Sequence, residues 1–292
     1  MHPSTTTTEN FIFIITVLCF GCLTSLFAYH LGYYTLPKEQ EKTTLTFMDV
    51  VKVFFIFLCV PLVMVPALFM LIIWIQTGNF PSSASLSVSE EMQGWLNIIL
   101  IGLTTAALLL FYFCLGKNKK RSILRSKAFH FFSCIEGIKM GGVTWLVAFP
   151  LVVGIGQFVA MATYWFFDRV PLEQVAVKQL KASLNDPFLF WVVSFGIVGI
   201  VPFLEEFIFR GCLQTWVKQR FGLFFSIVFS AFIFACFHFS PSQGIGNTEL
   251  IISLTILGSY LGFIYERQQS LSAPYALHAV FNGVSTLLIA LE

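Results

Sequence analysis

The sequence predicts an all-α protein, a polytopic membrane helical bundle of about eight transmembrane helices. Composition is the first observation: of 292 residues, 57% are hydrophobic and only 11% are charged, whereas a soluble domain carries about 25% charged residues. The second is a mean hydropathy of +0.82. The third is that the apolar residues gather in runs close to the ~20 residues that a bilayer-spanning helix needs. Together these observations exclude a soluble globular domain, a disordered chain and a nucleic-acid-binding protein.

The apolar runs define the predicted spans in order. They are Phe11–Tyr34, Val53–Ile75, Trp95–Leu115, Val143–Phe167, Phe188–Val217, Phe221–Phe239, Leu250–Tyr265 and Tyr275–Leu291. The fifth run contains Pro202, which removes a backbone N–H and should bend or break its helix. The seventh run is the short one. The loop from Asp168 to Asp186 has mixed charge and is expected to hold a short amphipathic surface helix.

The basic residues of the loops predict the orientation of the bundle. The third and fourth spans are separated by a basic group made up of Lys117, Lys119, Lys120, Arg121, Arg125, Lys127 and Lys139. The loop on the opposite side, between the fourth and fifth spans, has only Arg169, Lys178 and Lys181. The positive-inside rule therefore places the larger group in the cytosol and both termini outside the cell.

Ionisable residues at membrane depth are concentrated in the second half of the chain. Each costs on the order of 3 kcal/mol at the bilayer centre, so such residues indicate a functional site. The expected organisation is an N-terminal part, residues 1–142, with transmembrane helices and the basic cytosolic loop, and a catalytic region, residues 143–292. The residues that carry chemistry lie between positions 205 and 282.

Spacing assigns different roles to two adjacent carboxylates. Glu206 and Arg210 are four residues apart, in the favourable order for an ion pair along one helix face, so we expect them to be structural. Glu205 is rotated about 100° from Glu206 and has no cation nearby in the sequence. It is the carboxylate left available for chemistry.

The remaining polar groups complete a hydrolytic set. If the fifth and sixth spans form an antiparallel hairpin, Glu205 and His238 lie at similar depth and could take a proton from water as a general-base pair. His278 and Asn282 are four residues apart on the last span and offer two donors on one face, as a developing oxyanion needs. These four residues therefore predict hydrolysis of a peptide bond within the membrane.

Three short motifs in this order resemble those of the CPBP family, the CAAX proteases and bacteriocin-processing enzymes of the Abi domain class, which includes the type II CAAX prenyl endopeptidase. They are E-E-x-x-x-R at Glu205–Arg210, F-x-x-x-H at Phe234–His238 and H-x-x-x-N at His278–Asn282. The residues after Arg210 are similar to the prokaryotic branch. The resemblance covers roughly Phe188 to Leu291.

The resemblance implies an intramembrane protease of the glutamate type. It implies that Glu205 and His238 activate water, that His278 and Asn282 stabilise the oxyanion, and that the cavity opens to the cytosol. It further implies a peptide or protein substrate, including a lipidated CAAX tail, and no cofactor. The expected location is a bacterial cell membrane, with the lipid bilayer and the substrate as partners and no nucleic acid.

Three alternatives stay open. Glu205, His238 and His278 could instead be ligands of a catalytic zinc ion, although the sequence has no H-E-x-x-H motif. The same buried groups could serve a transporter or proton relay. The chain could also act without turnover, as an immunity protein that binds its partner.

Overall fold

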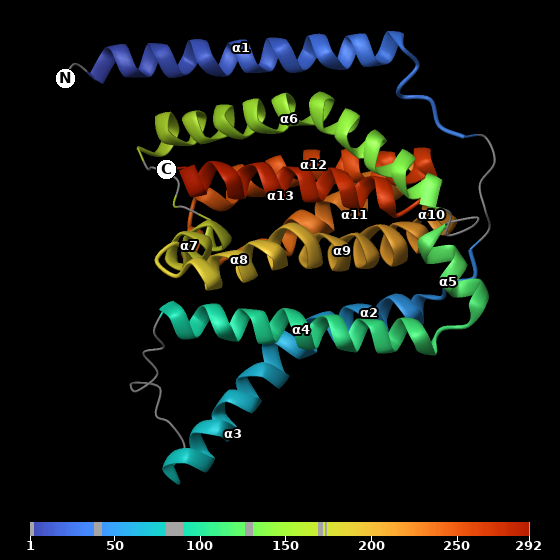
Figure 1. The fold of residues 1–292 in the computed structure, drawn as a ribbon. Helices are drawn as coiled ribbons and strands as arrows, with labels where there is room; N and C mark the ends of the chain where they lie inside the picture. The colour runs from blue at the N-terminus through green and yellow to red at the C-terminus, as the bar shows by residue number, and fades with distance from the viewer. Residues whose placement is uncertain are drawn as a thin grey trace.

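The computed structural model describes residues 3–37, 43–79, 90–125, 131–168, 172 and 174–291. It confirms an all-α bundle of long, roughly antiparallel helices (Figure 1). Large apolar side chains point outward along the bundle; the Phe166 side chain is 83% exposed and that of Phe224 is 81% exposed. An apolar surface of this extent is typical of a protein that faces lipid. Lys127 and Arg169, which entered the orientation argument, lie outside the described residues.

Seven helical segments within these ranges are long and apolar enough to cross a membrane. They are Phe11–His30, Phe47–Ile75, Gly94–Cys114, Ile135–Phe167, Pro187–Phe221, Gly246–Gln268 and Ser272–Leu291. The sixth predicted span corresponds to α11 (Leu223–Cys236), which has only 14 residues. The prediction of which span is short was therefore wrong.

The predicted seventh span is longer than its apolar run because its ends are polar but satisfied. Helix α12 covers Gly246–Gln268, 23 residues. At its start, the Asn247 side chain bonds to the backbone of Ser240 and Gly244. At its end, Glu266 is paired with Arg125 and Lys218. These partners allow the helix to continue past the hydrophobic stretch from which its length was predicted.

The fifth predicted span is interrupted, as Pro202 indicated, but the chain stays helical throughout. Two π-helical segments break the α-helical repeat. In order, the elements are α8 (Pro187–Phe195), η3 (Gly196–Ile200), α9 (Val201–Glu206), η4 (Phe207–Gln214) and α10 (Thr215–Phe221). The two glutamates therefore lie between two π segments, which are frequent at functional sites.

The described residues before position 168 form the first group of helices. They are α1 (Pro3–His30), α2 (Phe47–Cys59), η1 (Val60–Met64), α3 (Val65–Thr77), α4 (Glu90–Cys114), α5 (Lys117–Leu124) and α6 (Phe131–Phe167). Helix α6 begins 12 residues before the predicted span, so Lys139 lies within it and not in a loop. The expected helix in the Asp168–Asp186 segment is α7 (Val175–Ser183).

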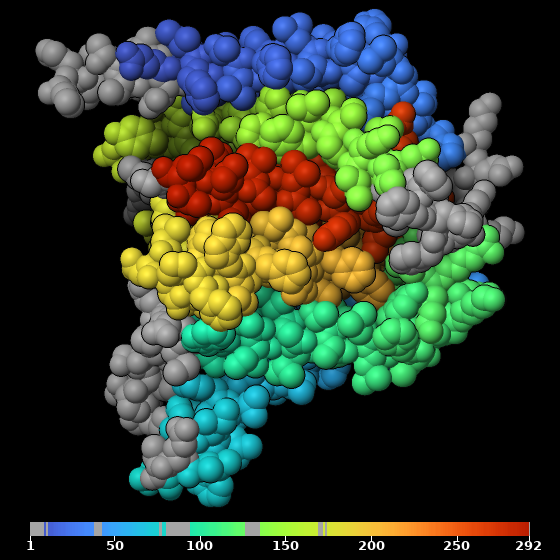
Figure 2. Space-filling model, in the orientation of Figure 1, coloured from blue at the N-terminus to red at the C-terminus, as the bar shows by residue number. Residues whose placement is uncertain are grey.

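Helices α8 to α12, together with α13 (Ser272–Leu291), occupy the middle of the stack (Figure 1). Helix α6 packs on α1, α12 and α13, and α12 also packs on α11. Figure 2 shows α13 lying between α6 on one side and α8 and α9 on the other. The start of α1 and the end of α13 lie at one end of the bundle, and α5 and α10 lie at the other (Figure 1). This arrangement agrees with termini and basic loops on opposite sides.

Helices α6 and α13 approach each other closely at Gly141. A Cβ atom there would lie 2.7 Å from Ala276 Cβ and 2.8 Å from Leu277 N, whereas one at Gly142 would meet nothing within 4 Å. Because the neighbouring atoms include backbone, they cannot rotate away.

We therefore expect Gly141→Ala to destabilise the folded protein by roughly 1–3 kcal/mol, as overpacking does. Thermal unfolding in detergent micelles measures this effect, and Gly142→Ala is the matched control. Equal melting temperatures for the two variants would contradict the close approach.

Candidate active site

Three of the four predicted catalytic residues meet around the carboxylate of Glu205 in α9. Glu205 Oε1 lies 3.7 Å from His238 Nε2, and Glu205 Oε2 lies 3.5 Å from His278 Nε2. The side chains differ in exposure: 12% for Glu205, 32% for His238 and 5% for His278. The site is therefore largely buried but opens on the His238 side.

His238 is held by the helix that precedes it. Helix α11 ends at Cys236, and the His238 ring folds back so that Nδ1 lies 3.0 Å from the Phe234 carbonyl oxygen. A carbonyl oxygen can only accept, so Nδ1 donates in this bond, and Nε2 is the ring nitrogen that faces Glu205. The Phe234 ring packs against both histidines, with centroids 4.8 Å from His238 and 5.7 Å from His278.

The ion pair expected from spacing is present beneath the site. Arg210 Nη1 donates to Glu206 Oε1 at 3.0 Å, and both side chains are fully buried. Arg210 also donates to the Gly258 carbonyl at 3.1 Å and lies 4.6 Å from the Phe234 ring centroid. A buried charge pair with further partners of this kind is a rigid element.

Glu206 has a second partner that the sequence did not indicate. Its Oε1 atom is 2.8 Å from His278 Nδ1. The His278 ring therefore bridges the two adjacent carboxylates, with Nδ1 toward Glu206 and Nε2 toward Glu205. Glu206 thus orients a site histidine as well as pairing with Arg210. No sequence signal could have found this contact, because the residues are 72 positions apart.

Asn282 lies one helical turn beyond His278 on α13. Its Nδ2 atom donates to the Ile197 carbonyl oxygen at 2.9 Å. The structure thus gathers Glu205, His238 and His278 at one point and engages Asn282 with the backbone of η3. One of the two N–H donors of this amide is therefore already engaged within the protein.

A row of polar residues runs from the site toward the α5 end of the bundle. Gln214, one turn after Arg210, donates to the Gly262 carbonyl and to Glu266. Lys218, one turn further, pairs with Glu266, which also pairs with Arg125. This row was not predicted from the sequence, although Glu206, Arg210, Gln214 and Lys218 recur every four residues and so share one helix face.

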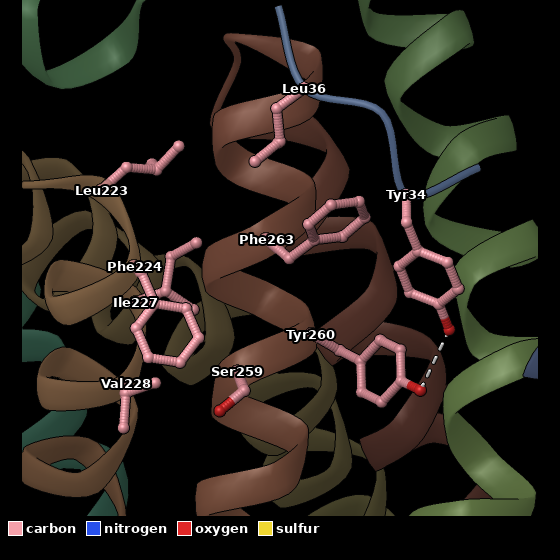
Figure 3. Close-up of a pocket in the computed structure, with 9 residues that line it drawn as sticks. All are labelled: Tyr34, Leu36, Leu223, Phe224, Ile227, Val228, Ser259, Tyr260 and Phe263. Carbon is pink, nitrogen blue, oxygen red and sulfur yellow. Dashed lines mark hydrogen bonds between the residues drawn. The ribbon is translucent and has the colours of Figure 1, made fainter. Parts of the chain in front are cut away.

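Within the described ranges, no group of three or more His, Cys, Asp or Glu side chains has the arrangement of a metal site. A cavity of about 510 Å³ lies elsewhere, between α11, α12 and the segment after α1 (Figure 3). Its lining is apolar apart from three hydroxyls, and the Tyr34 and Tyr260 hydroxyls are 3.4 Å apart at one edge. None of the four predicted catalytic residues lines it.

Comparisons with known proteins find a family similarity in this part of the chain. Residues 187–284, from α8 into α13, match the family model described as "Type II CAAX prenyl endopeptidase Rce1-like". The chain is also 29% identical over 139 residues to the UPF0177 protein YaiF of Lactococcus lactis subsp. lactis (strain IL1403). That similarity covers 47% of this chain and 57% of the relative, so the chain matches little more than half of the relative's length.

No solved structure matches the chain. The matched segment contains all six residues predicted to carry or support the chemistry, and it ends two residues after Asn282. The segment 187–284 is therefore similar to the Rce1-like type II CAAX prenyl endopeptidases.

Proposed function

We propose that the protein is an intramembrane endopeptidase in which Glu205 and His238 activate water and His278 and Asn282 stabilise the oxyanion. The observation that supports this best is the convergence of both histidine Nε2 atoms on one carboxylate, at 3.7 and 3.5 Å. Separations somewhat longer than hydrogen bonds are common at catalytic sites without substrate. The family of residues 187–284 supports the same reaction class.

In this mechanism Glu205 accepts a proton from water while the water oxygen attacks the peptide carbonyl carbon. The carbonyl π electrons move to oxygen, and the oxyanion accepts hydrogen bonds from His278 and Asn282. Collapse of the tetrahedral intermediate breaks the C–N bond, and the proton held by Glu205 passes to the leaving amine. The reaction consumes one water molecule and releases a carboxylic acid and an amine, and none of its steps requires a cofactor.

The proposed substrate is a membrane-associated peptide or protein, including a prenylated CAAX-type C-terminus. The family description supports this class. The proposed location is a bacterial cell membrane, with both termini outside and the site reached from the cytosol. The described basic residues Lys117, Lys119, Lys120 and Arg121 in α5 support this orientation, because α5 lies at the end of the bundle opposite to the termini (Figure 1).

A zinc-dependent protease is the second candidate, and one observation favours it. Both histidines have Nδ1 bonded to an oxygen atom, His238 to a carbonyl and His278 to a carboxylate. Such bonds are typical of histidines that bind a metal through Nε2. Glu205, His238 and His278 would then be the ligands, and Asn282 would have no role in the chemistry, but among the described residues these three side chains do not have the arrangement of a metal site.

The test is cleavage of a synthetic peptide by the purified protein in lipid vesicles, analysed by mass spectrometry. Matched peptides with a farnesylated and an unmodified CAAX terminus are compared, each with and without a zinc chelator. We expect cleavage that the chelator does not affect. Inhibition by the chelator that added Zn²⁺ reverses would favour the metal mechanism. Binding of the peptide without any cleavage would favour an immunity function, and solute uptake by the vesicles would favour transport.

A further inference from the structure

The π-helical segment η3, together with Pro202, interrupts the α-helix before Glu205, and we call this interruption the π break. It leaves the carbonyl oxygen of Ile197 without its usual backbone donors. In η3 the Val201 N–H bonds to the Gly196 oxygen, five residues back. The Ile197 oxygen would take its donor from Val201 in an α-helix and from position 202 in a π-helix. Val201 is already bonded to Gly196, and Pro202 has no N–H.

Asn282 supplies the missing donor from another helix. Its Nδ2 atom lies 2.9 Å from the Ile197 oxygen. A polar backbone group without a partner is costly in the membrane interior, and proline is tolerated there when a neighbouring helix satisfies the freed group. The Asn282–Ile197 bond is such a cross-helix tie, and it joins α13 to the break.

The direction of Glu205 depends on the geometry of this break. Glu205 lies three residues after Pro202, in the six-residue helix α9. If the π segment relaxed to α-helix, the register would change by one residue and Glu205 would turn by about 100°. That turn would remove its carboxylate from His238 and His278. Helix α13 carries both Asn282 and His278. It therefore positions His278 directly and Glu205 through the Ile197 carbonyl, and these are the two residues of the 3.5 Å contact.

We propose that Asn282 is a positioning residue, which holds the π break through the Ile197 carbonyl and thereby keeps the Glu205 carboxylate between the two histidines. An amide nitrogen has two N–H donors, so one remains for the oxyanion. The catalytic consequence rests on the proposed function of Glu205. The tie itself does not, and it can be measured without any activity.

The first test is hydrogen–deuterium exchange of peptides that cover residues 196–206 in detergent micelles. In Asn282→Ala we expect exchange of this segment to be at least about tenfold faster than in the unmodified protein, because the break loses its tie. Gln214→Ala is the matched control: it removes a buried amide-to-carbonyl bond of 3.0 Å, to Gly262, away from the break. Unchanged exchange of residues 196–206 in Asn282→Ala would overturn the proposal.

The second test separates positioning from oxyanion stabilisation. Pro202→Ala restores a backbone N–H at the break and so removes the need for the tie. Asn282→Ala should lower kcat at least about 100-fold when Pro202 is present, and clearly less in the Pro202→Ala background. An equal loss in both backgrounds would show that Asn282 acts only on the oxyanion. Retained hydrolysis in Glu205→Gln would refute the proposed function. It would not affect the hydrogen–deuterium exchange result, which measures the Asn282–Ile197 bond without any activity.

Discussion

Glu205→Gln is expected to lower the rate constant of peptide hydrolysis by roughly 10²–10⁴-fold, the contribution of a positioned general base. The substitution keeps the size of the side chain and removes its capacity to accept a proton from water. Both histidine Nε2 atoms face this carboxylate, at 3.7 and 3.5 Å. Their own Nδ1 atoms are already engaged with Phe234 and Glu206. Each histidine therefore has only its Nε2 atom directed toward Glu205.

Steady-state hydrolysis of the CAAX peptide measures the effect, and thermal unfolding shows whether the variant is folded. Glu249→Gln is the control, because Glu249 is a partly buried carboxylate in the first turn of α12, in the same bundle. It should leave hydrolysis unchanged. Near-normal turnover by Glu205→Gln would refute the role of Glu205 as the base.

Glu206→Ala is expected to destabilise the folded protein by about 3–5 kcal/mol, the usual consequence of leaving one member of a buried ion pair alone. Arg210 is fully buried and would keep only the Gly258 carbonyl and the Phe234 ring as partners. The His278 ring would also lose its Nδ1 acceptor. Yield of folded protein and thermal unfolding in micelles measure the stability.

A double variant separates the two roles of Glu206. In Glu206→Gln/Arg210→Met both charges are gone, and replacing a whole buried pair is often neutral for stability. We expect stability to recover relative to Glu206→Ala. Hydrolysis should stay low, because a neutral amide holds the His278 imidazole less strongly than a carboxylate does. An unchanged melting temperature in Glu206→Ala would contradict the buried pair.

Much of the site could be predicted from the sequence because it depends on distances within one helix. Residues four apart share a helix face whatever surrounds them, so Glu206 and Arg210 could be paired from spacing alone. Pro202 removes a backbone donor in any context, so the interruption of the fifth span could be predicted as well. Each of the eight apolar runs contains a helix. In lipid the backbone N–H and C=O groups must bond within their own segment, and a helix achieves this.

Tertiary structure decided which helix faces meet. The contacts of Glu206 with His278, Arg125 with Glu266 and Asn282 with Ile197 join residues 72, 141 and 85 positions apart. They arise from helix crossings and from close approaches such as that at Gly141, which depend on packing across the whole bundle. The short span was misassigned for a related reason: the polar C-terminal end of α12 continues as helix because Arg125 and Lys218, from other segments, pair with Glu266. The spacing of residues within a helix thus determines which side chains share one face. The packing of neighbouring helices determines which side chains that face contacts.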